Sequence, residues 1–134
     1  MSRQEGNVEK TSIVKIQNVL IVTLQGDIDD HSAQELQQEI LQSVIHHQVS
    51  GVVIEVSQLK LVDSYMGRIL SDTARMIRLM GAETLLVGLR PMVAITIVEM
   101  GLSIEGVKTA LNLEDALEVL KGGRAAAPSL GRDG

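Results

Sequence analysis

The sequence lacks cysteine, tryptophan and phenylalanine, and its only aromatic residue is Tyr65. Without cysteine the chain can form no disulfide, thiolate nucleophile or thiolate metal ligand, and we expect a protein of the reducing cytoplasm. Without tryptophan and phenylalanine, the core must be built from aliphatic side chains. The chain also offers no row of aromatic rings on which bases or sugars could stack.

Positive charge is scarce as well. The 134 residues include 12 Lys and Arg against 17 Asp and Glu, which gives a formal net charge of −5. Phosphate binding needs a clustered excess of basic side chains, so this balance argues against nucleic acid and favours protein partners. No apolar run approaches the roughly 20 residues that span a bilayer, and MSRQEGNVEK at the N-terminus has no apolar signal core. We therefore expect no membrane association.

Segments typical of strands and of helices alternate along the chain. Short β-branched runs predict strands, and apolar residues at i, i+3, i+4 spacing predict helices. In chain order we expect a hairpin of the runs from Thr11 and Val19, a helix over Ala33–His47, a strand over Val52–Val56, a helix from Met66 to Met80, a strand over Thr84–Leu89, a helix begun by Pro91, a weak strand over Val107–Leu111 and a helix over Leu113–Lys121. This alternation predicts a single α/β domain with a mixed, mostly parallel sheet of about five strands and about four helices.

Several residues mark where these elements begin and end. Ser32, followed three residues later by Glu35, forms a capping box for the first helix, and Asn112 is expected to cap the last one. Gly81 and Gly101 are expected to end the second and third helices. The domain is thus expected to cover residues 11–121, preceded by a short segment at 1–10. The tail at 122–134 is rich in small and turn-prone residues and is expected to be disordered.

The stretch KLVDSYMGRIL, residues 60–70, introduces the second helix. Asp63 and Ser64 are both preferred N-cap residues, and either one can satisfy a free backbone amide at a gain of about 1 kcal/mol. Gly67 in the first turn leaves the backbone open to close approach, and Tyr65 would project near the same helix end. Together with Met66, these residues are expected to form an exposed surface for a protein partner.

No set of residues supports a catalytic site. Ser64 would need a base within hydrogen-bonding reach to act as a nucleophile, and no motif ties it to His31, His46 or His47. Asp63 is a poor base for a serine, and no G-x-S-x-G elbow surrounds the pair. We therefore expect no catalytic residue and no enzyme.

Metal and nucleotide sites are equally unsupported. His46 and His47 are adjacent and would point about 100° apart on a helix, so they cannot chelate one metal ion. The acidic cluster of Asp27, Asp29 and Asp30 lacks the glycine and glutamate of an EF-hand loop, and a solvated turn is favoured. Neither G-x-G-x-x-G nor G-x-x-x-x-G-K-[ST] occurs. We expect no metal and no cofactor, although an α/β domain can still hold a ligand beyond the carboxyl ends of its strands.

The order of elements, with an Asp-Ser pair at the start of the second helix and a proline at the start of the third, resembles the STAS domain family of sulfate transporters and anti-sigma-factor antagonists. The resemblance covers Thr11 to Lys121. The motifs VDS, LMGA, VGLRP and VEMGL look specifically like the small single-domain scaffold of the bacterial stressosome.

This resemblance implies a regulatory role. Such scaffolds assemble with larger paralogous STAS co-antagonists into a shell that holds a serine/threonine switch kinase. On stress, the kinase phosphorylates a serine that matches Ser64 and leaves, and a phosphatase later resets the site. Commoner antagonists read Asp-Ser-Ser/Thr-Gly-Leu, whereas Tyr65 and Met66 stand at the third and fourth places here and glycine is shifted to position 67. A ligand- or nucleotide-binding STAS module, or an antagonist acting directly on an anti-sigma factor, remains the alternative.

Overall fold

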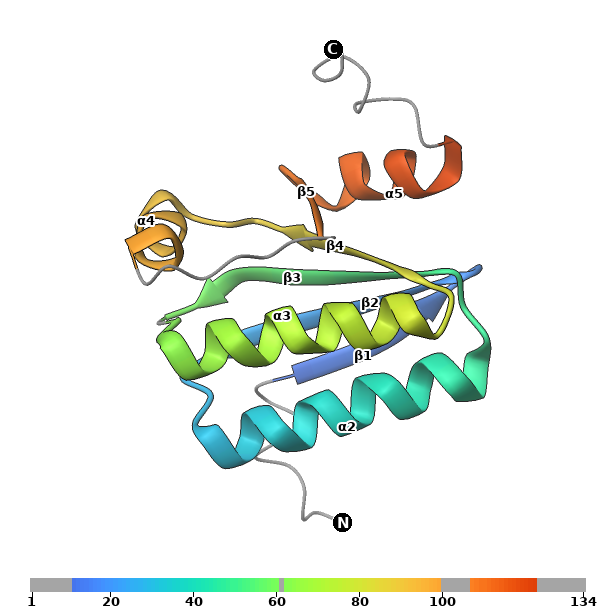
Figure 1. The fold of residues 1–134 in the computed structure, drawn as a ribbon. Helices are drawn as coiled ribbons and strands as arrows, with labels where there is room; N and C mark the ends of the chain where they lie inside the picture. Colours follow the sequence, from blue (N-terminus) through green and yellow to red (C-terminus); the bar gives the residue numbers. More distant parts are fainter. Residues whose placement is uncertain (1–10, 61, 100–106, 123–134) are drawn as a thin grey trace.

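The computed structural model describes residues 11–60, 62–99 and 107–122. Within these residues the chain forms one five-stranded sheet and four helices (Figure 1). The elements are β1 (Thr11–Ile16), β2 (Val19–Gly26), α2 (Asp30–His47), β3 (Gly51–Leu59), α3 (Ser64–Leu79), β4 (Glu83–Val87), α4 (Pro91–Glu99), β5 (Lys108–Ala110) and α5 (Leu113–Gly122). The sheet order is β1-β2-β3-β4-β5, with β1 antiparallel to β2 and the remaining pairs parallel. The predicted α/β class is confirmed.

The sheet separates two aliphatic cores. In Figure 1, α2 and α3 run side by side across one face, and α5 lies on the opposite face. In the central strand β3, Val52 and Ile54 belong to the larger core under α2 and α3, whereas Val53 belongs to the smaller core under α5. All three are fully buried. A strand covered on both faces has no solvent side, which explains the continuous apolar run.

The hairpin prediction is confirmed, and Gln17 adopts the positive φ of 56° that its tight turn requires. The predicted capping box is wrong. The helix begins three residues earlier, where Asp29 Oδ1 accepts a hydrogen bond from the Ser32 amide at 2.8 Å. Three acidic side chains, of Asp27, Asp29 and Asp30, precede Ser32. Asp29 reaches the free amides and becomes the cap, so Ser32 lies inside the first turn.

The later elements occur in the predicted order, and several of their ends differ from the prediction by one to three residues. Gly88 has a φ of +80° and follows the end of β4 at Val87, so that strand is shorter than predicted. Pro91 is the first residue of α4, and Asn112 Oδ1 accepts from the Asp115 amide at 2.9 Å at the start of α5. The predicted stop at Gly101, the segment 1–10 and the tail beyond Gly122 lie outside the described residues.

Helix α4 divides its apolar side chains between the core and the solvent. Val93 and Ile97 are buried, whereas Met92, Ile95 and Val98 are exposed. The composition of this helix is thus explained only in part by the domain's own core. None of the described helices is long and apolar enough to cross a bilayer.

Candidate functional site

The start of α3 is held by Asp63. This residue is the N-cap in extended conformation, and its Oδ1 accepts a hydrogen bond from the Met66 amide at 2.9 Å. Its carbonyl accepts from the Gly67 amide, also at 2.9 Å, which closes the first turn. The sequence left the cap open between Asp63 and Ser64, and the structure assigns it to Asp63.

Ser64 is therefore the first residue of the helix rather than its cap. Its side chain is exposed, and within the described part of the chain its hydroxyl has no hydrogen-bond partner. The amides of a first helical turn have no acceptor within the helix and, together with the helix dipole, favour an anion. Chemically, this site offers an accessible hydroxyl at a position that tolerates negative charge.

The neighbours of Ser64 differ in exposure. Asp63 is exposed, and Tyr65 is half-buried against the larger core. The expectation that Met66 and Gly67 would be exposed is wrong, because Met66 is 3% exposed and Gly67 is also buried. Met66 begins the apolar stripe that packs α3 onto the sheet, and this demand for burial outweighs its place in the first turn.

Sequence reasoning missed Arg90. It stands before Pro91 in the loop after β4, and its guanidinium donates a hydrogen bond to the Leu59 carbonyl at the end of β3. Because β3 and β4 are parallel, their carboxyl ends lie side by side, and this contact brings a positive charge to the end of the sheet from which the chain continues into α3. The only indication of this contact in the sequence is an arginine immediately before a helix-starting proline. That pattern does not specify which carbonyl the side chain reaches.

The described residues give no support to a catalytic base for Ser64 or to a metal site. His31 is exposed and pairs with Glu35 at 3.2 Å on α2, and His46 and His47 lie in the last turn of that helix. None of the three is hydrogen-bonded to Ser64 in the residues that the structure describes. In those residues no three metal-ligating side chains of the His, Asp or Glu type come together.

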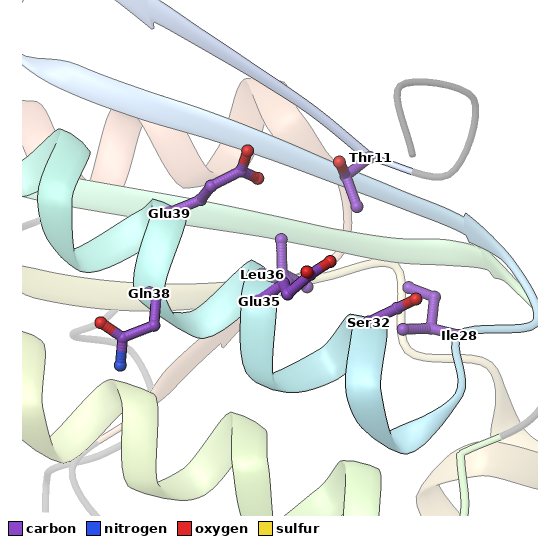
Figure 2. Close-up of a pocket in the computed structure, with 7 residues that line it drawn as sticks. All are labelled: Thr11, Ile28, Ser32, Glu35, Leu36, Gln38 and Glu39. Atoms are coloured by element: carbon purple, nitrogen blue, oxygen red, sulfur yellow. The ribbon is translucent and has the colours of Figure 1, made fainter. Parts of the chain in front are cut away.

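A cavity of about 360 Å³ lies between the start of β1 and α2 (Figure 2). Its described lining consists of Thr11, Ile28, Ser32, Glu35, Leu36, Gln38 and Glu39. Figure 2 shows Glu39 pointing from α2 toward β1, with Thr11 on the strand opposite. The two carboxylates, with no basic side chain among these residues, would repel phosphate groups. This cavity therefore gives no support to a nucleotide site.

The cap predicts a measurable stability effect. Replacing Asp63 with alanine is expected to lower the free energy of unfolding by about 1 kcal/mol, because the Met66 amide loses its acceptor. Urea denaturation followed by circular dichroism would measure the change. Asn112→Ala, which removes the equivalent cap bond from α5, is the matched control and should cost a similar amount. A negligible cost for Asp63→Ala beside a cost of about 1 kcal/mol for Asn112→Ala would contradict this role.

Comparisons with known proteins agree with this geometry. The STAS domain family model matches residues 10–116. A solved structure of RsbS from Moorella thermoacetica with a serine-to-glutamate substitution is 35% identical, with a TM-score of 0.75, and the match covers 83% of this chain and 94% of that one. A chain from a structure titled as the molecular architecture of the stressosome is 34% identical, with a TM-score of 0.71, over 85% of this chain and 100% of that one.

A curated relative is the RsbT co-antagonist protein RsbRA of Bacillus subtilis. It is 29% identical over 109 residues, which cover 74% of this chain. The match spans 40% of the length of RsbRA, so it concerns one part of a larger protein. The family match, the five-stranded sheet and the Asp-capped start of α3 together show that this chain belongs to the STAS domain family.

Proposed function

We propose that this chain is a non-enzymatic scaffold of a stressosome, which binds and sequesters a serine/threonine switch kinase and releases it when Ser64 is phosphorylated. The observation that carries the proposal is the exposed Ser64 at the first position of α3, beside a cap already provided by Asp63. A hydroxyl that is not needed for the cap can be modified without unfolding the helix. A phosphatase would then restore the original surface.

The similar proteins support the scaffold role. One is named as an RsbT co-antagonist, and another comes from a stressosome structure. The solved RsbS carries glutamate in place of a serine, a change that adds negative charge to that protein. Larger paralogues with a related STAS domain are accordingly proposed as partners of this chain in a shared assembly.

The electrostatics of the helix start favour phosphorylation of the free domain. A phosphate adds about −1.5 to −2 charges, and the amides of the first turn and the helix dipole stabilise it. Arg68 lies four residues after Ser64 on the same helix and is exposed, so it can pair with the phosphate at i, i+4 spacing. Asp63 opposes the charge, and the net local effect on folding should be small.

The contact surface is proposed to be smaller than the sequence suggested. Asp63, Ser64 and the accessible part of Tyr65 would meet the kinase directly. Met66 and Gly67 are buried, so they would not touch the kinase. Their packing would instead fix the direction of the first turn and so the position of the contact residues. An added phosphate would lie within this surface, where a partner's apolar groups could not solvate it.

The test is to incubate the protein with its cognate kinase and ATP and to locate the phosphate by mass spectrometry. We expect phosphate on Ser64 and none on Ser64→Ala, which should still retain the kinase because it presents no charge. The parent protein should release the kinase as phosphorylation proceeds. Phosphate at another residue only, with Ser64 unmodified, would refute the site, and release of the kinase by Ser64→Ala would refute the switch.

A further inference from the structure

Thr84, the second residue of β4, has a buried hydroxyl without a partner. The residue is 3% exposed, and within the described part of the chain its Oγ1 forms no hydrogen bond. An unsatisfied buried hydroxyl lowers the stability of a fold, whereas valine would fill the same volume without that cost. The presence of threonine here therefore needs a reason other than packing.

The position of Thr84 suggests that reason. It lines a cavity of about 390 Å³ at the amino ends of β4 and β5, together with Arg78, Ala82, Glu83, Val107 and Lys108. Arg78 is exposed in the last turn of α3, and it forms no ion pair with any described residue. Lys108 and Glu83 approach each other at 3.4 Å, a long contact between half-exposed side chains. Such a pair is weak and can open.

We infer that this cavity binds a small organic oxyanion, a phosphate ester or a carboxylate on a short apolar body. Arg78 offers a fork of N–H donors that suits either anion. Lys108 adds a second positive charge, and the single carboxylate of Glu83 offsets one of the two, so the lining keeps one net positive charge. Ala82 and Val107 supply apolar wall. Thr84 lines the same cavity, so an oxyanion bound there could accept a hydrogen bond from its otherwise unpaired hydroxyl.

This site is separate from Ser64. The two lie at opposite ends of α3, because Arg78 follows Ser64 by fourteen residues, which corresponds to about 20 Å of helix. It also differs from the cavity beside β1, whose lining carries two carboxylates and no described basic residue. Oxyanion binding is thus expected where basic side chains and the unpaired hydroxyl coincide.

The test is a titration of the ¹⁵N-labelled full chain with inorganic phosphate, phenyl phosphate, benzoate and phenol, followed by NMR. We expect saturable shifts of the Thr84 and Lys108 amides with phenyl phosphate or benzoate, and the tighter of these two identifies the oxyanion. Inorganic phosphate should bind roughly ten-fold more weakly because it lacks an apolar body, and neutral phenol should not bind. Failure of all three anions to saturate below about 10 mM would overturn the proposal.

Three variants sharpen the result. Arg78→Gln should weaken binding roughly ten-fold, whereas Arg75→Gln, which removes the same charge from the same helix outside the cavity, should leave it unchanged. Thr84→Val should weaken binding while raising Tm by about 2–5 °C, since it removes the unpaired hydroxyl. Equal binding by Arg78→Gln and the parent, equal losses in both arginine variants, or a lower Tm for Thr84→Val would each refute the site.

Discussion

Replacing Ser64 with aspartate is expected to weaken binding of the switch kinase more than about 100-fold, equivalent to roughly 3 kcal/mol. The side chain is exposed at the first position of α3, so the charge is placed on the proposed contact surface and not inside the domain. Covering an anion with a partner that offers no counter-charge costs several kcal/mol. Titration calorimetry with the purified kinase would measure the loss, and enzymatic phosphorylation should produce at least the same effect.

Two variants test whether Ser64→Asp weakens kinase binding through its negative charge, through its larger side chain, or through added charge anywhere on the domain. Ser64→Asn has nearly the size of aspartate without its charge, and it should retain most of the affinity. Ser32→Asp adds the same charge to the first turn of α2, at a half-exposed site outside the proposed surface, and should bind normally. If asparagine at position 64 released the kinase as completely as aspartate, steric fit would be the cause and the charge switch would be wrong.

The domain's stability should change little in these variants. The cap bond from the Met66 amide to Asp63 does not involve the Ser64 side chain, and a negative charge in a first turn is favoured by the helix dipole. Thermal unfolding of Ser64→Asp within a few degrees of the parent would therefore show that reduced kinase binding reflects the surface rather than a damaged fold. This comparison should accompany the calorimetry.

Much of the fold could be predicted because it depends on local signals. β-branched runs, helical spacing, Pro91 and Asn112 each act within a few residues. They gave the kind and order of the elements correctly, although several strand and helix ends differ from the prediction by one to three residues. The first cap failed because Asp29 and Ser32 both satisfy the local rule, and only the path of the chain out of β2 decides which one reaches the free amides.

The position of the candidate site could be predicted from the sequence, but the exposure of its side chains could not. Asp63 and Ser64 mark a helix start by residue type alone, whereas the burial of Met66 depends on how α3 sits on the sheet. The contact of Arg90 with Leu59 joins two segments that are far apart in the sequence. The unpaired state of the Thr84 hydroxyl is known only when all of its neighbours in the fold are known. No pattern in a single sequence reports such properties.

Gly88 gives the largest stability effect that we expect from a small substitution. Its φ of +80° lies in the region that side chains rarely adopt, and an added Cβ would approach Ser57 Cβ to 2.8 Å and the Ser57 amide nitrogen to 3.2 Å. The same Cβ would lie 2.6 Å from Glu55 Oε2, which itself accepts a hydrogen bond from the Ser57 hydroxyl. Glu55 can move, but the Ser57 backbone is fixed within β3.

Gly88→Ala is therefore expected to lower the free energy of unfolding by about 3 kcal/mol, of which about 1 kcal/mol comes from the backbone conformation. Gly26→Ala is the matched control, because Gly26 has a φ of +75° and nothing within 4 Å of an added Cβ, so it should show the conformational cost alone. Urea denaturation of both variants gives the steric part by difference. Equal losses of unfolding free energy in the two variants would mean that β3 and the loop after β4 shift to accommodate the methyl group. The close packing of Gly88 against Ser57 would then not be what holds that loop in place.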